Sequence, residues 1–279
     1  MRTMVKGKEI VEAAFADVES FFVPSGNFTV NRELNVDDIS YASIKGSGVN
    51  ARIRVSRGIC EYEITKIEDY LFVLIILCHE LAHYLNFHNE HKDQEELDSV
   101  ALESRADHFG SQILLVLMTF KTNTSKLIRT IEPKLDQNLA IRSIGKALGD
   151  IYQEIYRNCN SELYPQPNLR VGLTVAGCLS FFHRYLGELP KEFTLSFILN
   201  VVRAGNLTHI LQSMDDSQQE QVVDKLVSTH SRLQQEQPFM NQGFKPHFGL
   251  LLTSQFDLSP SQMKMHRESL EAHVQTFMN

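Results

Sequence analysis

An apolar run leads straight into a group of titratable residues in the stretch LFVLIILCHELAHYLNFH, residues 71–88. Leu71 to Cys78 are all apolar, His79 and Glu80 follow at once, and His83 comes one helical turn later. Burying two imidazoles and a carboxylate costs free energy unless they are bonded to something. A divalent metal ion would provide such a partner. The stretch therefore predicts a buried helix that carries metal ligands.

The spacing His-Glu-x-x-His suggests a different role for each residue. Residues four apart on an α-helix differ by about 40° of rotation, so His79 and His83 project from one face at a spacing that suits tetrahedral zinc. Glu80 lies about 100° further round, beside the metal. From there its carboxylate can take a proton from metal-activated water without ligating the ion.

A catalytic zinc site needs a third protein ligand and one open position. The segment ALESRADHFG, residues 101–110, places Glu103 twenty residues after His83 and Asp107 on the same helical face. We expect Glu103 to complete the site and Asp107 to accept a hydrogen bond from His79. Gly110, one turn on, would let the two helices approach closely. Other carboxylates compete with Glu103 for the ligand role: Glu95, Glu96 and Asp98.

Other polar residues near the motif have less specific interpretations. His88 lies about 140° round the helix from His83, so we expect it to cap the helix or to contact a ligand without binding metal. His91 and His108 are predicted at the surface. The four cysteines show no paired short spacing, which predicts reduced thiols, with Cys78 a buried apolar side chain.

Composition and charge argue against a nucleic-acid-binding protein and against a membrane-spanning one. The chain has 279 residues, is 43% hydrophobic and carries a net charge of −7. Without a long basic run, a nucleic-acid partner is not expected. The longest apolar run is far below the roughly 20 residues of a membrane span, and the N-terminus has no apolar secretory segment. These features predict no membrane span and a cytoplasmic location.

Residue patterns predict an α+β fold with a small N-terminal sheet and a mostly helical remainder. We expect a helix over residues 8–22, strands within 28–34 and 41–63, and a helix from a capping box at Thr65 and Glu68 to about His88. A second long helix should end near Phe120, KTNTSK should be a loop, and a third helix should span Leu135 to Asn158. Helices should fill the rest, the last beginning at Ser259 and Pro260.

Four segments together resemble the gluzincin zinc peptidases, and within them the family of the CAAX prenyl protease and its bacterial heat-shock relatives. They are NARIRVSRGI, CHELAHYLNFH, ESRAD and YPQPNLR, and they extend over about residues 49–171. A phage-exclusion-type protease with the same helix pair is an alternative resemblance. The resemblance implies a zincin-like catalytic domain, here residues 1–190, followed by a helical segment, 191–279, that completes the fold or shapes the cleft.

The resemblance also implies roles for particular residues. Asn50 and Ala51 match an edge strand that binds extended substrate, and His88 matches a further family histidine. Tyr164 and Arg170 keep the spacing of a family His-Pro and Arg element, which implies substrate binding by Arg170, but tyrosine replaces the histidine. Tyr164 would then donate to the developing oxyanion, with His183 a weaker candidate. The chain departs again in lacking the membrane segments that many family members carry.

Together these features predict a zinc-dependent endopeptidase acting on a protein or peptide substrate. Zn²⁺ would be held by His79, His83 and Glu103, and Glu80 would move the proton. The alternative is a zincin scaffold that binds zinc without catalysis and acts as an interaction or regulatory module. The sequence leaves the oligomeric state open.

Overall fold

The structure is a computed structural model that describes residues 5–90, 99–120, 122–159, 163–212, 216–236 and 243–252, with residues 265, 268 and 272. Its α-helices are α1 (Gly7–Ser20), α2 (Arg57–Glu61), α3 (Ile67–Leu85), α4 (Ser99–Thr119), α5 (Asn123–Ile131), α6 (Gln137–Glu154), α7 (Pro167–Leu186), α8 (Lys191–Ala204), α9 (Asp216–Glu236) and α10 (Pro246–Leu252). Its strands are β1 (Val5–Lys6), β2 (Arg32–Val36), β3 (Ala42–Lys45), β4 (Arg52–Ser56) and β5 (Glu63–Ile64). The predicted α+β class, with a small sheet and a helical remainder, is confirmed.

A three-stranded sheet has the order β2-β4-β3. β4 pairs in parallel with β2, Ile53 opposite Arg32, and antiparallel with β3, Ile53 opposite Ile44. β4 is therefore the central strand, and β2 and β3 are the edges. Residues 57–61, predicted as strand, instead form α2, where the Ser56 hydroxyl caps the helix by accepting from the Ile59 N–H.

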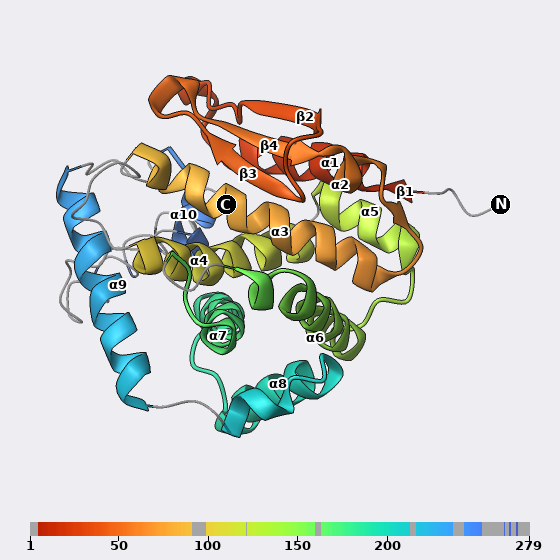
Figure 1. Ribbon diagram of the computed structural model, residues 1–279, viewed down its shortest axis with the longest axis vertical. Coiled ribbons are helices and arrows are strands. Elements are labelled where there is room, and N and C mark those ends of the chain that lie inside the picture. Colours follow the sequence, from red (N-terminus) through yellow and green to blue (C-terminus); the bar gives the residue numbers. More distant parts are fainter. Residues whose placement is uncertain are drawn as a thin grey trace.

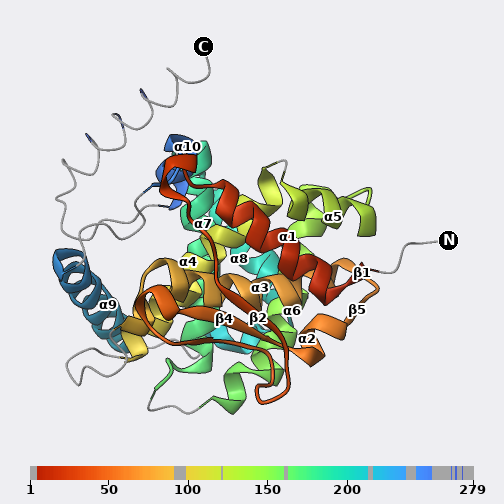
Figure 2. The ribbon, with the colours of Figure 1, turned by 90° about the horizontal axis from the view of Figure 1, so that it is seen from above.

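The elements lie in layers around α3. Figures 1 and 2 show the sheet over α3, and Figure 1 shows α4, α6, α7 and α8 below it. α3 packs against α1, α4, α6, β3 and β4. Every residue of α3 from Ile67 to Cys78 is buried, as its continuous apolar run predicts.

The ends of α3 differ from the prediction. The helix ends at Leu85, and a separate 3₁₀ turn, η3 (His88–Glu90), follows. The capping carboxylate belongs to Asp69, which accepts from the backbone N–H of Thr65 and of Lys66 at 3.1 and 3.2 Å. Glu68 instead pairs with Lys146 of α6. The capping box is therefore one residue later than predicted.

Two other predicted boundaries differ from those in the structure. KTNTSK is not a loop throughout, because α5 begins at Asn123 with Thr122 as its cap. The carboxylate of Asp17 in α1 accepts from the backbone N–H groups of Asn123 and Thr124, at 2.8 and 2.7 Å. The third predicted helix divides into α6 and the 3₁₀ turn η4 (Tyr156–Asn158). The predicted helix start at residues 259–260 lies outside the described residues.

One hydrophobic core extends across the predicted boundary at residue 190. Buried side chains of α8 and α10, such as Phe197 and Leu252, belong to the same cluster as those of α1 and α3. α8 packs on α6 and α9 on α4. Within the described residues, none of the helices combines the length and apolar character that crossing a membrane requires. The division of the chain at residue 190 stays a prediction.

Candidate metal centre

The two histidines of the motif converge on one point, as predicted. Nε2 of His83 lies 3.1 Å from Nε2 of His79, and the rings meet edge to face at 80°. Both side chains come from the last two turns of α3, after its apolar run. Two imidazole lone pairs at this distance repel each other unless a proton or a cation lies between them.

Glu103 of α4 completes the group. Its Oε2 lies 3.1 Å from Nε2 of His79, and its Oε1 lies 3.4 Å from Nε2 of His83. A tetrahedral ion with ligand bonds of about 2.0–2.1 Å holds neighbouring ligand atoms about 3.4 Å apart. The three side chains therefore form a group that could hold a metal ion. The competing carboxylates, Glu95, Glu96 and Asp98, lie outside the described residues, as does His91.

The charges of His79 and Glu103 depend on each other and on their neighbours. Burial lowers the pKa of His79, but Asp107 and Glu103 outweigh it and raise this pKa to about 10. Burial raises the pKa of Glu103, yet the two histidines hold it well below its usual range. Without metal, His79 therefore carries an extra proton, and its positive charge lies between the carboxylates of Glu103 and Asp107. A divalent cation could replace that proton, and this donor set of two imidazoles and one carboxylate suits zinc.

Asp107 lies behind the ligands, as predicted. Its Oδ1 is 2.9 Å from Nδ1 of His79, an ion-pair contact that orients the ring, although the geometry at Nδ1 is not that of the predicted hydrogen bond. Arg170 of α7 holds Asp107 through two bonds, Nε to Oδ2 at 2.7 Å and Nη2 to Oδ1 at 2.9 Å. The Tyr156 hydroxyl donates to Oδ1 at 3.4 Å. Burial raises the pKa of Asp107, but Arg170 and His79 outweigh it and lower this pKa.

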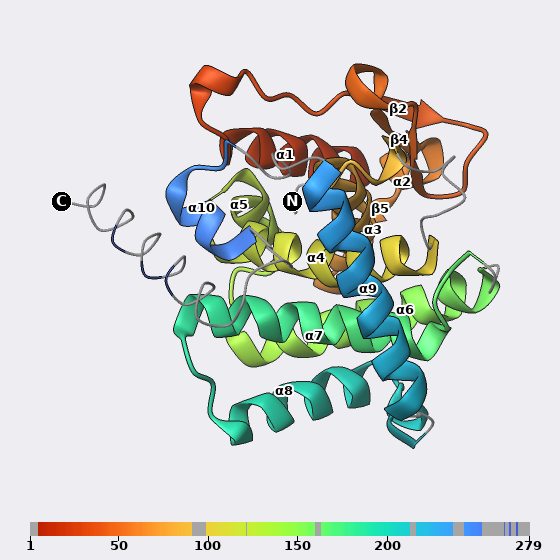
Figure 3. The same ribbon diagram turned by 90° about the vertical axis from the view of Figure 1, so that its left-hand side faces the viewer.

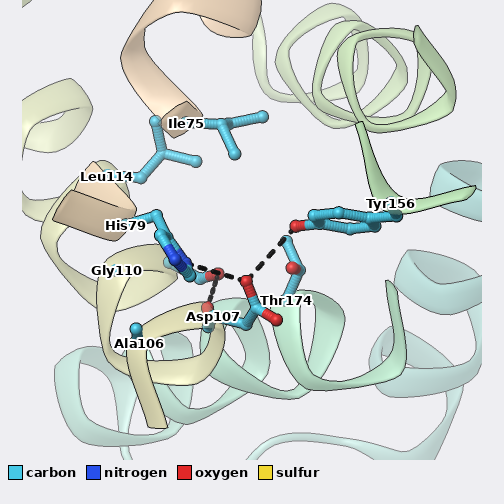
Figure 4. Close-up of a pocket in the computed structure, with 9 residues that line it drawn as sticks. Ile75, His79, Ala106, Asp107, Gly110, Leu114, Tyr156 and Thr174 are labelled. Atoms are coloured by element: carbon cyan, nitrogen blue, oxygen red, sulfur yellow. Dashed lines mark hydrogen bonds and ion pairs between the residues drawn. The ribbon is translucent and has the colours of Figure 1, made fainter. Parts of the chain in front are cut away.

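A small cavity of about 10 Å³ adjoins His79 and Asp107. Figure 4 shows Tyr156 and Thr174 on one side of Asp107 and His79 on the other. The volume is near the lower limit for a single water molecule. The Asp107 side chain is only 1% exposed and that of His79 16%, so their contact is largely shielded from bulk solvent.

Gly110 lies at the crossing of α3 and α4, as predicted. A Cβ atom there would lie 2.9 Å from the carbonyl oxygen of Cys78 and 3.1 Å from Cα of His79. Only glycine permits this backbone approach. The close crossing brings Glu103 within reach of His79 and His83 on α3.

Glu80 and Tyr164 are both near the group. Glu80 is partly exposed and forms no hydrogen bond or ion pair with the part of the chain that the structure describes. Tyr164 is partly exposed, and its ring lies 5.3 Å from the guanidinium carbon of Arg170. Burial and the charges of Glu103 and Glu80 contribute to raising the pKa of Tyr164 to about 12. Its hydroxyl therefore keeps its proton near neutral pH and can donate a hydrogen bond.

The predicted substrate residues are placed differently from the expectation. Ala51 precedes β4, which is the central strand and not an edge strand, so β4 cannot pair with a substrate. Asn50 is exposed at the end of the 3₁₀ turn η2 (Gly48–Asn50). Arg170 is only 3% exposed and is bonded to Asp107, which gives it a supporting position behind the ligands. Contact between Arg170 and a substrate therefore remains a prediction, and this buried position does not favour it.

Several lesser expectations are also resolved. His88 is fully buried and its Nδ1 lies 2.8 Å from Nδ1 of His83, so it contacts a ligand as predicted. His108 is not at the surface: it is partly buried beside Arg105, and burial with nearby arginines lowers its pKa to about 3. His183 is exposed thirteen residues along α7 from Arg170, about 20 Å of helix, so it is no oxyanion donor. The cysteines are free thiols, and burial raises the pKa of Cys78 well above its usual range.

Sequence reasoning missed His230. This residue of α9 is fully buried, and its Nε2 lies 3.1 Å from Nε2 of His88. Nothing in its neighbourhood, VDKLVSTHSRL, has a ligand-like spacing. Only the packing of α9 against α4 brings it to the site.

Comparison with known proteins adds nothing to this geometry: no protein-family model, no curated protein and no solved structure matches the chain.

Proposed function

We propose that this protein is a zinc-dependent endopeptidase with a zincin-like fold. The observation that carries the proposal is the convergence of three ligand atoms next to a carboxylate, Glu80, that has no bond to any described residue. A purely structural zinc site is closed by four protein ligands, whereas a catalytic site has three and one open position. Among the described residues, His79, His83 and Glu103 are the grouped ligands.

A bound zinc ion supplies a Lewis acid that polarises a scissile carbonyl and makes water easier to deprotonate near neutral pH. With zinc held by His79, His83 and Glu103, Glu80 would accept a proton from the attacking water and deliver it to the leaving amine. Tyr164 would donate a hydrogen bond from its hydroxyl to the carbonyl oxygen as negative charge develops there. Asp107, held by Arg170, keeps the His79 ring in place during these steps.

The strand that suits an extended substrate is β3. Its partner β4 occupies one side, and no described strand pairs with the other. The Tyr41 carbonyl accepts from the Ser56 N–H of β4 at 2.8 Å. Because backbone groups alternate in direction along an antiparallel strand, Ala42 and Ile44 present theirs at the outer edge. β3 packs against α3, so a substrate strand added there would run beside the helix that carries the ligands.

The test compares the protein with its Glu80→Gln variant on a mixture of denatured proteins, with new N-termini identified by mass spectrometry. The variant keeps the shape of the side chain but lacks the basic carboxylate. We expect it to fold and retain zinc while cleavage falls by about 10²–10⁴-fold. A chelator should stop cleavage by the unmodified protein, and added zinc should restore it.

Two outcomes would overturn the proposal. A zinc-loaded Glu80→Gln variant that cleaves at the full rate would remove Glu80 from the chemistry. Zinc-loaded protein that cleaves nothing in the mixture, nor any protein of the host cell extract, would instead support a zinc-binding module without catalysis.

A further inference from the structure

Four imidazoles form a continuous chain from the metal centre to α9. His79 contacts His83, Nδ1 of His83 contacts Nδ1 of His88 at 2.8 Å, and Nε2 of His88 contacts Nε2 of His230 at 3.1 Å. At the far end, Nδ1 of His230 lies 2.9 Å from the backbone carbonyl oxygen of Leu226. The last three imidazoles are at most 6% exposed. Figure 3 shows α9 crossing in front of α4, the helix that it packs against.

The carbonyl of Leu226 determines where each proton lies. A carbonyl oxygen only accepts, so Nδ1 of His230 must carry hydrogen, and in the neutral ring Nε2 then has the lone pair. His88 and His230 are both fully buried, and a buried charged ring is costly unless it is paired, so both rings are neutral near pH 7. Nε2 of His88 must therefore donate to His230, which leaves its Nδ1 as an acceptor. Nδ1 of His83 must donate to that acceptor.

The alternation of donors and acceptors ends at Nε2 of His83, the atom that would bind the metal. With hydrogen on Nδ1, the neutral His83 ring has its lone pair on Nε2, the nitrogen that faces His79 and Glu103. Reversing all three tautomers would keep a donor and an acceptor at each imidazole contact, but it would set the lone pair of His230 Nδ1 against the carbonyl oxygen of Leu226. It would also place a hydrogen where the metal must bind.

We propose that His230 and His88 are positioning residues that hold His83 in its metal-binding tautomer, so that zinc affinity depends on the docking of α9. The inference rests on the metal centre of the proposed function. The two histidine ligands are then oriented by different devices. A carboxylate, Asp107, orients His79, whereas a chain of neutral imidazoles anchored on a helix carbonyl orients His83.

Two substitutions of His230 separate the hydrogen bond from packing. His230→Leu fills the space but removes the acceptor, so His88 no longer has a preferred tautomer. His230→Gln places an amide oxygen near the position of Nε2 and restores the acceptor. We expect the zinc Kd, measured by competition with a chromogenic chelator, to rise by about 10–100-fold in the leucine variant and to stay within threefold of the unmodified protein in the glutamine variant.

The tautomers themselves can be read without metal or activity. Long-range ¹H–¹⁵N NMR spectra of zinc-free protein containing ¹⁵N-histidine distinguish the protonated ring nitrogen from the other. We expect hydrogen on Nδ1 of His83, Nε2 of His88 and Nδ1 of His230. Far-UV circular dichroism and the thermal midpoint of the zinc-free forms report whether each variant folds.

Three results would overturn the inference. They are hydrogen on Nε2 of His83, a folded leucine variant with unchanged zinc Kd, and equal losses in the leucine and glutamine variants. If the leucine variant does not fold, the NMR assignment on the unmodified protein decides. Failure of the proposed function looks different, because it would appear as unmodified protein that binds no zinc or cleaves nothing, whatever the tautomers are.

Discussion

Replacing Gly110 by alanine should weaken zinc binding strongly while lowering overall stability only a little. The added Cβ would lie 2.9 Å from the Cys78 carbonyl oxygen, whereas ordinary contacts begin at 3.4 Å. The neighbouring atoms belong to the backbone of α3 and cannot rotate away. The helices must therefore separate by about 0.5 Å at this point, since neither partner can yield in place. Glu103, two turns earlier on α4, would move away from His79 and His83.

The two effects of the substitution differ in size. Overpacking costs about 1–3 kcal/mol, but exchanging glycine for alanine within a helix returns up to about 1 kcal/mol. We expect a net loss of about 0–2 kcal/mol in the free energy of unfolding. Metal sites tolerate distance errors of only about 0.2 Å, so the zinc Kd should rise by on the order of tenfold or more.

The assay measures zinc Kd by chelator competition and stability by urea unfolding of the zinc-free protein. Gly145→Ala is the matched control: its Cβ would overlap the Val201 carbonyl oxygen at the α6–α8 contact, away from the metal centre. This control should lose stability and keep its zinc affinity. A Gly110→Ala protein with unchanged zinc Kd would refute the claim that the close helix crossing sets the ligand geometry.

Three further predictions concern other contacts. Asp107→Ala should weaken zinc binding by ~10–100-fold, and Glu103→Ala should weaken it more, as measured by chelator competition. Asp107→Ala should also lower the free energy of unfolding by about 3–5 kcal/mol in urea, because Arg170 is left buried without its carboxylate. Burial lowers the pKa of His230 to about 3, so below pH 6.5 the unfolded chain takes up a proton that the folded protein refuses. By pH 5 this should cost about 2 kcal/mol of stability in zinc-free protein, and urea unfolding should show a shallower fall in His230→Gln. Ala42→Pro removes an outward N–H from the free edge of β3, so kcat/KM on an extended peptide should fall by about 2–10-fold while Ala42→Val retains it; equal values would remove β3 from substrate binding.

The parts of the site that sequence predicts are those that depend on local helical geometry. His79 and His83 share a face of α3 because they are four residues apart, and Glu103 and Asp107 share a face of α4 for the same reason. The glycine needed at their crossing could also be identified, since Gly110 continues that face. The buried run before His79 likewise predicts a central helix.

Features that depend on distant contacts could not be predicted. The position of β4 between β2 and β3 follows from strand pairing, which residue alternation alone does not determine. α5 begins where it does partly because Asp17, far away in sequence, accepts two of its free N–H groups. His230 reaches the site only because α9 packs on α4.

Everything proposed for this protein depends on a metal ion bound by His79, His83 and Glu103. The direct measurement is the zinc content of purified protein by mass spectrometry of the intact chain under native conditions and by elemental analysis. We expect one zinc per chain at neutral pH, released in acid as protons displace the metal from the histidines, and none in a His79→Ala, His83→Ala double variant. Unmodified, folded protein that contains no divalent metal, even after zinc is added, would contradict the proposal.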